Sequence, residues 1–72
     1  MTVKDVLELE EVKDVLQDFG EVFIFYDNKV YEMDNRFLNC QVEEWENDFN
    51  VYINIYLANK PNNWLRSLKK WN

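Results

Sequence analysis

The stretch Phe49–Leu57, FNVYINIYL, predicts its own structure more clearly than any other part of the chain. Aliphatic residues alternate along it with tyrosine and asparagine, so one set of side chains would point to each face of a β-strand. The aliphatic set is Val51, Ile53, Ile55 and Leu57, and the second set is Tyr52, Asn54 and Tyr56. We therefore predict a strand with a buried aliphatic face and a polar, aromatic outer face, preceded by a turn at Asn47–Asp48.

Three segments before this stretch also predict strands. Glu21–Tyr26 (EVFIFY) is rich in β-branched and aromatic residues, and a tight turn of Asp and Asn leads from it into a second arm, Lys29–Met33. Cys40–Glu46 (CQVEEWE) predicts a third strand that is polar enough to be partly exposed. Between the second and third strands we expect a loop or a single helical turn, capped by Asp34 or Asn35.

The N-terminal residues predict a helix in two pieces. Thr2 followed by Asp5 is typical of a helix N-cap with an acidic residue in the first turn. The apolar residues fall on two helical faces that are rotated away from each other, so one straight helix would not bury both. The first face holds Val3, Val6 and Leu7, and the second holds Leu9, Val12, Leu16 and Phe19. We expect a break near residues 8–11 and a helix end with Gly20 at C′, where glycine is common.

The C-terminal residues predict an amphipathic helix that begins near Pro61. Its apolar face holds Trp64, Leu65, Leu68 and Trp71, and its basic face holds Arg66, Lys69 and Lys70. Such an apolar stripe is more often core than a surface for a membrane or a partner. Together the elements predict a single α+β domain over residues 1–72. It would be a small four-stranded antiparallel sheet, ordered as a meander and flanked by the N-terminal helical segment and this C-terminal amphipathic helix.

Composition limits the classes of function. A chain of 72 residues forms one domain with a thin core. Its single cysteine, Cys40, excludes an intrachain disulfide and favours a reducing compartment, so we expect a cytoplasmic protein. No apolar run is long enough for a membrane span. Three Trp, four Tyr and five Phe exceed the needs of a minimal core, and either an aromatic-rich core or an interface would explain them.

Catalytic chemistry lacks its usual groups in this sequence. The chain has no histidine, which removes the commonest general base and the Cys/His type of zinc site. Cys40 and Ser67 therefore have no histidine to activate them as nucleophiles. The acidic residues 43–48 lack the spacing of a calcium loop, and a domain of this size seldom has room for a glycosidase groove. We expect a protein that is not an enzyme and needs no cofactor or metal.

The charges are sorted along the sequence. All fourteen acidic residues lie at or before Asp48, so residues 1–48, with four basic residues, carry a net charge of −10, and residues 49–72 carry +4. An acidic surface repels nucleic acid and attracts a basic protein, and it also keeps a small domain soluble. The basic C-terminal residues offer a different site, for a small anionic ligand such as a nucleotide. That site would use Trp64, Arg66, Lys69 and Lys70.

Three short stretches carry a resemblance to known proteins: residues 1–8 (MTVKDVLE), 23–27 (FIFYD) and 51–55 (VYINI). Through them, residues 1–57 resemble a group of short uncharacterised proteins from phages and prophages of Firmicutes. The chain departs from that group at Val30–Met33, where no glycine follows the glutamate. The resemblance implies a phage-borne accessory protein. Small acidic proteins of that kind often inhibit host defence; some resemble anti-CRISPR proteins that mimic DNA, and others look like sponges for nucleotide signals.

Three hypotheses of function follow from these observations. In the first, a non-catalytic phage-type protein in the host cytoplasm inhibits a nucleic-acid-binding defence protein by docking an acidic, DNA-mimic-like surface on the basic surface of that protein. The expected partner-binding residues are Glu43, Glu44, Trp45, Glu46, Asp48 and Tyr52, with Glu8, Glu10 and Glu11 as further candidates. In the second, a homo-oligomeric sponge sequesters a nucleotide through the C-terminal site. In the third, the chain is a structural or interaction module of a phage assembly. None of the three requires direct binding to nucleic acid or to a membrane.

Overall fold

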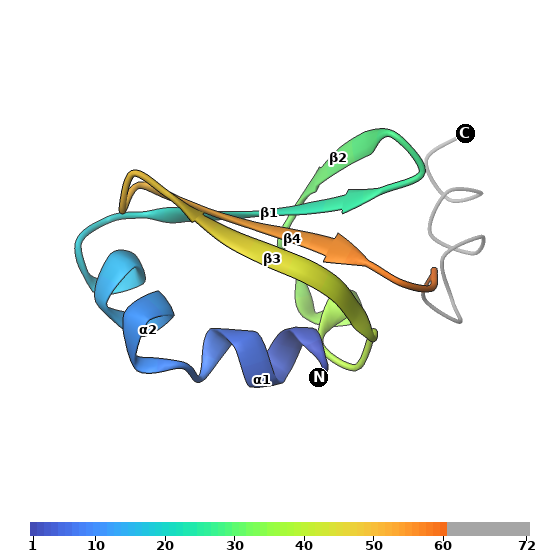
Figure 1. Cartoon of the computed structure of the whole chain (residues 1–72), viewed down its shortest axis with the longest axis horizontal. Coiled ribbons are helices and arrows are strands. Elements are labelled where there is room, and N and C mark those ends of the chain that lie inside the picture. The colour runs from blue at the N-terminus through green and yellow to red at the C-terminus, as the bar shows by residue number, and fades with distance from the viewer. Residues whose placement is uncertain (61–72) are drawn as a thin grey trace.

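The structure is a computed structural model, and it describes residues 1–60 of the chain (Figure 1). In chain order its elements are α1 (Val3–Leu7), α2 (Glu10–Gln17), β1 (Glu21–Tyr26), β2 (Lys29–Glu32), the 3-10 helix η1 (Asn35–Phe37), β3 (Val42–Asp48) and β4 (Tyr52–Leu57). α1 and α2 lie on the same side of the four-stranded sheet (Figure 1). The α+β class is therefore confirmed, whereas the helix expected after Pro61 lies outside the described residues.

The N-terminal helical segment is divided as predicted, and Thr2 caps its first piece. The Thr2 hydroxyl oxygen accepts a hydrogen bond from the Asp5 backbone N–H at 3.3 Å, and the Asp5 carboxylate accepts one from the Thr2 backbone N–H at 2.9 Å. This capping box satisfies N–H groups that the start of a helix leaves without a partner. The break between the helices falls at Glu8–Leu9, and each helix buries two valines.

The sheet is mixed, so the predicted antiparallel meander is wrong. Its strand order is β2-β1-β4-β3, with β1 and β4 running parallel in the centre and an antiparallel strand on each edge. β1 and β4 are the most apolar strands. In the centre of the sheet each is flanked by a neighbouring strand on both edges, which shields it from solvent. The edge strands β2 and β3 carry charged side chains, which discourage an exposed edge from pairing with another chain. Residues 33–41, which include η1, connect one edge of the sheet to the other.

The turn between β3 and β4 lies later in the chain than predicted. It consists of residues 48–51 and is closed by a backbone hydrogen bond of 3.1 Å from the Val51 N–H to the Asp48 carbonyl. Its central residues, Phe49 and Asn50, both have positive φ, 56° and 58°, as in the tight turns that match the twist of a hairpin. β3 therefore ends at Asp48, and β4 begins only at Tyr52.

The end of α2 also differs from the prediction. The left-handed position after the helix, with a φ of 64°, belongs to Phe19, and the next residue, Gly20, donates its N–H to the Val15 carbonyl at 2.9 Å. Gly20 is needed for a different reason, because its backbone lies against its neighbours. A Cβ at this position would come within 2.6 Å of the Val15 carbonyl oxygen and 2.9 Å of the Val51 carbonyl oxygen. Close approach, and not left-handed backbone, requires this glycine.

The core lies between the helices and the face of the sheet that they cover, which we call the covered face. Its buried residues are Val3, Val6, Val12, Val15, Ile24, Phe37, Ile53, Ile55 and Leu57. The predicted aliphatic face of the last strand is thus confirmed at Ile53, Ile55 and Leu57, whereas Val51 lies in the turn and is 46% exposed. Within residues 1–60, no helix is long and apolar enough to cross a bilayer.

Candidate functional site

The face of the sheet turned away from the helices, which we call the open face, is made by alternate residues of all four strands. The pairing register places Phe23 of β1 beside Glu32 of β2 and Asn54 of β4, and Asn54 in turn beside Glu46 of β3. Counting in steps of two along each strand gives the full set of side chains on this face. They are Val30, Glu32, Glu21, Phe23, Phe25, Tyr52, Asn54, Tyr56, Glu44, Glu46 and Asp48.

Aromatic rings occupy the centre of the open face. Phe25 of β1 stacks on Tyr56 of β4, with ring centroids 4.7 Å apart, and Phe23 lies tilted against Tyr52 with centroids 5.6 Å apart. Both pairs bridge the two central, parallel strands, and cross-strand aromatic pairs stabilise a sheet. Tyr52 nevertheless keeps 41% of its surface exposed, so its ring is available to a partner.

Three carboxylates line the β3 edge of the open face. Glu44, Glu46 and Asp48 stand on alternate residues of one strand, so they repeat at intervals of about 6.7 Å. The Tyr56 hydroxyl donates a hydrogen bond to the Glu46 carboxylate at 2.9 Å. This bond, together with the burial and the nearby acidic groups, raises the pKa of the Tyr56 phenol, which keeps it in its neutral, donating form. Every charged residue in the set that forms the open face is acidic.

The structure brings together four of the six residues expected to bind a partner. Glu44, Glu46, Asp48 and Tyr52 share the open face. Trp45 pairs with Ile55 on the covered face and packs, partly buried, against the core. Glu43 is exposed and lies in the bulge between Val42 and Glu44, without a partner residue in β4. The other candidates lie apart from the open face or outside the described residues. Glu8, Glu10 and Glu11 are exposed residues of the N-terminal helical segment, whereas Trp64, Arg66, Lys69 and Lys70 fall beyond residue 60.

Two phenylalanines are placed where the sequence patterns did not predict them. Phe19 and Phe49 are 94% and 90% exposed, and both stand on left-handed backbone. For an L-residue that conformation costs about 1–2 kcal/mol, and glycine or asparagine adopts it far more readily. The hydrophobic pattern assigned Phe19 to the apolar face of a helix and Phe49 to a strand, so neither was expected at the surface. The only hint in the sequence is the composition of residues 47–50, NDFN, which is typical of a turn.

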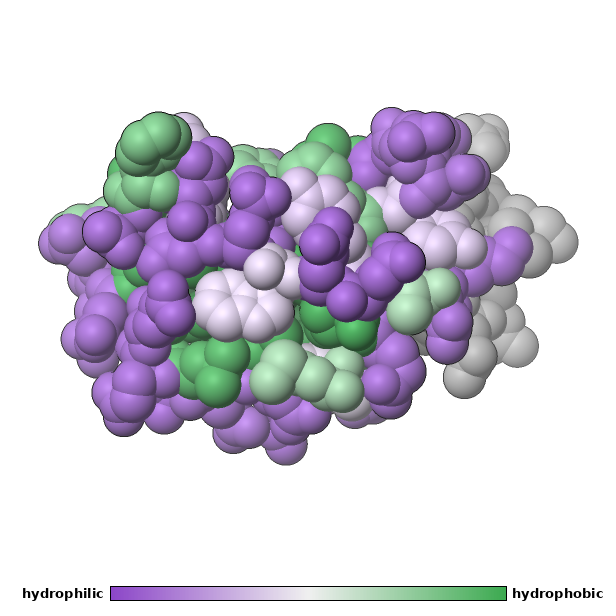
Figure 2. Space-filling view, viewed as in Figure 1, coloured by the Kyte–Doolittle hydropathy of each residue, from purple (hydrophilic) through white to green (hydrophobic). Residues whose placement is uncertain are grey.

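Phe19 and Phe49 lie at the same end of the sheet. Each precedes one of the two parallel strands. The Glu21 backbone N–H donates to the Val51 carbonyl at 2.9 Å, which joins the first residue of β1 to the turn before β4. We call this region, with Phe19, Phe49 and the exposed Val51, the phenylalanine end. Figure 2 shows a hydrophobic projection at the end of the molecule where the β3–β4 turn lies, above a mostly hydrophilic flank.

An acidic hollow of about 400 Å³ adjoins the phenylalanine end, between α2 and the β3–β4 turn. It is lined by Glu11, Asp14, Val15, Asp18, Asn47 and Asn50. The Asn47 side chain ties the two elements together, because it donates to the Glu11 carboxylate at 3.2 Å and to the Asn50 side-chain oxygen at 2.9 Å. Phe19 follows the lining residue Asp18 in sequence, and Phe49 precedes the lining residue Asn50. Two residues that line the hollow are therefore next in sequence to the two exposed phenylalanines.

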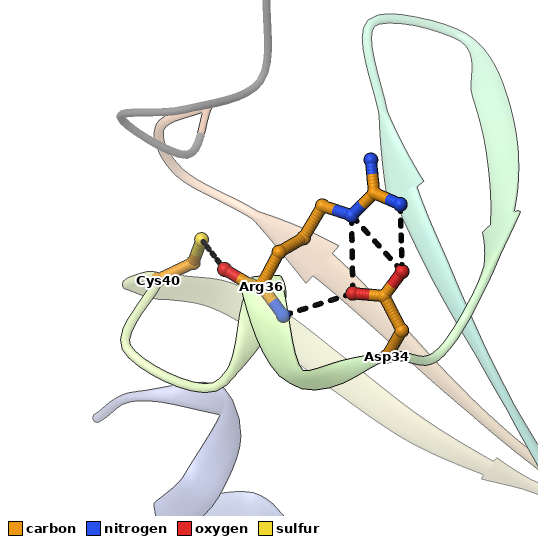
Figure 3. A network of polar contacts seen from close by, with 3 residues as sticks. All are labelled: Asp34, Arg36 and Cys40. Atoms are coloured by element: carbon orange, nitrogen blue, oxygen red, sulfur yellow. Dashed lines mark hydrogen bonds and ion pairs between the residues drawn. The ribbon is translucent and has the colours of Figure 1, made fainter. Parts of the chain in front are cut away.

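A separate polar cluster holds the connection between β2 and β3 (Figure 3). The Asp34 carboxylate accepts hydrogen bonds from the backbone N–H and the Nε of Arg36, and it forms an ion pair of 2.8 Å with the same guanidinium. These bonds hold the pKa of the Asp34 carboxyl below its usual range. The Cys40 thiol points to the Arg36 carbonyl at 4.0 Å, and burial raises its pKa. A raised pKa disfavours the reactive thiolate form of this cysteine.

Residues 1–60 contain no group of three or more Asp, Glu, Cys or His side chains arranged to hold a metal ion. What the described residues do assemble is a surface with acidic and aromatic groups side by side. Comparison of the chain with protein-family models, with curated proteins and with solved structures finds no match.

Proposed function

We propose that the protein is a phage-type accessory protein that binds a basic, nucleic-acid-binding protein of the host through its open face and inhibits it by occupying its nucleic-acid site. The observation that carries this proposal is the row of three carboxylates, Glu44, Glu46 and Asp48, on one strand edge of a face whose charged residues are all acidic. The phage context comes from the resemblance of residues 1–57 described above.

The spacing of the carboxylates suits a surface that normally binds nucleic acid. Their repeat of about 6.7 Å is close to the distance between neighbouring phosphates along one strand of B-DNA, which is about 7 Å through space because the strand winds around the helix axis as it rises about 3.4 Å per phosphate. A row of Lys or Arg side chains that contacts successive phosphates would therefore meet Glu44, Glu46 and Asp48 in succession. Charge-assisted hydrogen bonds to carboxylates have the same donors and nearly the same lengths as those to phosphates.

Residues next to the carboxylate row would supply affinity that charge alone does not give. In the register of β3 and β4, Tyr52 lies opposite Asp48 and Tyr56 opposite Glu44. Exposed charges at an interface mainly set the association rate and the choice of partner, whereas aromatic side chains more often dominate the binding free energy. Residues 1–60 carry fourteen acidic and five basic residues, a net charge of −9, which would accelerate encounters with a basic protein.

The test compares two variants that lose the same number of charges. Glu44→Gln/Glu46→Gln/Asp48→Asn removes the carboxylate row, and Glu8→Gln/Glu10→Gln/Asp27→Asn removes three acids away from the open face. Immobilised wild-type protein is used to capture proteins from a Firmicute lysate, and the captured protein is then titrated with wild type and both variants from 50 to 300 mM NaCl.

We expect a captured protein that binds DNA, a complex that weakens steeply with salt, and competition between DNA and the wild-type protein. The row variant should bind at least tenfold more weakly than the control variant. A salt-insensitive complex, or equal binding by the two variants, would rule out an acidic mimic on the open face.

A further inference from the structure

We infer that the phenylalanine end is an apolar anchor for the same basic partner: Phe19 and Phe49 enter an apolar recess of that partner, and a Lys or Arg beside the recess enters the acidic hollow. This inference rests on the proposed function. It adds a requirement on the partner surface that binding to the carboxylate row alone would not impose. The partner surface must be amphipathic, with apolar residues next to its basic ones, and not simply basic.

First, neither phenylalanine contributes to the core of the described fold. A side chain that is 90% or more exposed gains almost nothing from burial within residues 1–60, and both rings stand on backbone that favours Gly or Asn. Large aromatic residues on conformationally restricted turns are typical of binding anchors, because little conformational freedom is lost when they are covered.

Second, the exposed hydrophobic residues are concentrated at one end of the sheet. The exposed large hydrophobic residues of the described chain are Met1, Phe19, Val30, Phe49, Val51 and Tyr52. Four of these six lie at one end of the sheet, since the Glu21–Val51 hydrogen bond joins the first residue of β1 to the turn before β4. Single exposed hydrophobic residues need no explanation, whereas a contiguous patch rimmed by polar groups marks an interaction site.

Third, the charges at this end of the sheet select the occupant. The titratable groups that line the hollow are Glu11, Asp14 and Asp18, and Asp48 precedes Phe49 in the turn. These acids disfavour an anionic lipid surface and nucleic acid, and they would face one another if two copies of the chain met end to end. A cationic side chain in the hollow satisfies them, and the adjacent rings attract cations as well. The phenylalanine end adjoins the open face through Asp48 and Tyr52, whereas Asn47 of the hollow stands on the covered face. A partner that contacts both the carboxylate row and the hollow must therefore reach around this end of the sheet.

The experiment uses two synthetic 18-residue helical peptides as probes. One has Leu and Lys on opposite helical faces, and the other has every Leu replaced by Gln and the same number of Lys. Each is titrated into the full-length wild type, into Phe19→Asn/Phe49→Asn, and into the matched control Phe19→Tyr/Phe49→Tyr, which keeps two aromatic rings at the same positions. The row variant described above is titrated in parallel, and sedimentation measurements report the oligomeric state of each protein.

We expect the Asn variant to bind the Leu/Lys peptide at least tenfold more weakly than wild type, and the Tyr variant to bind it with an affinity within threefold of wild type. The affinity for the Gln/Lys peptide should be the same for wild type and both variants. Equal binding of the Leu/Lys peptide by wild type and the Asn variant overturns the anchor and leaves the proposed function standing. If the row variant binds both peptides as tightly as wild type does, that result instead contradicts the proposed function. A dimer of the wild type that disappears in the Asn variant also overturns the inference, since the occupant is then a second copy.

Discussion

Replacing Phe19 and Phe49 by asparagine should stabilise the isolated protein. A left-handed conformation costs an L-residue about 1–2 kcal/mol, and asparagine, which adopts it several-fold more readily than other residues, recovers roughly half of this. The rings are 94% and 90% exposed, so almost no buried apolar area is lost on substitution. Each change should therefore raise the free energy of unfolding by about 0.5–1 kcal/mol, and the double variant by about 1–2 kcal/mol. For a domain of this length, 1 kcal/mol raises Tm by about 4–8 °C.

Thermal and urea unfolding followed by circular dichroism measure this gain. Val30→Asn is a suitable control, since Val30 is also exposed but lies on a strand with ordinary extended backbone. It should leave Tm unchanged or lower it slightly, because asparagine is a poor strand residue. A double variant that unfolds at a lower temperature than wild type would refute the reasoning. The phenylalanines would then be packed in solution, and their exposure could not be an argument for a binding role.

Three other substitutions and conditions test the local structure. Gly20→Ala should destabilise the fold by about 2 kcal/mol, measured by urea unfolding, because the added Cβ meets the carbonyl oxygens of Val15 and Val51. Thr2→Ala should lower the free energy of unfolding by about 1 kcal/mol because the N-cap is lost, and Thr2→Ser should retain most of the stabilisation by the cap. The pKa of the Asp34 carboxyl is lowered by its hydrogen bonds to the neighbouring guanidinium, so its stabilising contribution is present above an unfolded pKa of about 3.9 and is lost as pH falls through the folded value. A pH series of unfolding curves should show stability decreasing below about pH 4, and Asp34→Asn should make that decrease shallower.

Local sequence patterns predict most elements of this fold correctly. The Thr2 cap, the break near Glu8, the strand at 21–26 and the turn capped by Asp34 all depend on residues close together in sequence, and the structure confirms each of them. The errors in element boundaries are of a different kind. At residues 47–52 the apolar pattern continues through a turn, because Phe49 and Val51 extend the alternation although they are exposed. Hydrophobic periodicity does not distinguish a residue buried in the domain from one presented to a partner.

The predicted strand order is wrong, although the sequence contains a signal for the correct one. Glu21–Tyr26 contains one charged residue and Tyr52–Leu57 contains none, whereas Lys29–Glu32 contains two and Val42–Asp48 contains four. A meander would leave the two apolar strands as the exposed edges, which proteins avoid. The segment of residues 33–41 is also longer than the connection that a hairpin needs. Both points favour the mixed sheet over a meander.

The topology explains why the candidate site was only half visible in the sequence. The acidic residues of β3 are neighbours in the chain, so their row could be predicted once the strand was recognised. The phenylalanine end depends instead on the direction of β1 relative to β4. In an antiparallel meander the two strands begin at opposite ends of the sheet, and Phe19 and Phe49 would be separated by the length of a strand. Because β1 and β4 are parallel, the residues that precede them meet at one end, beside Asp48 and the acidic hollow. The parallel pair thus places two exposed rings, 30 residues apart in sequence, at the end of the sheet where the carboxylate row ends. Because apolar and acidic groups lie close together there, the occupant we propose is a partner with apolar and basic residues side by side.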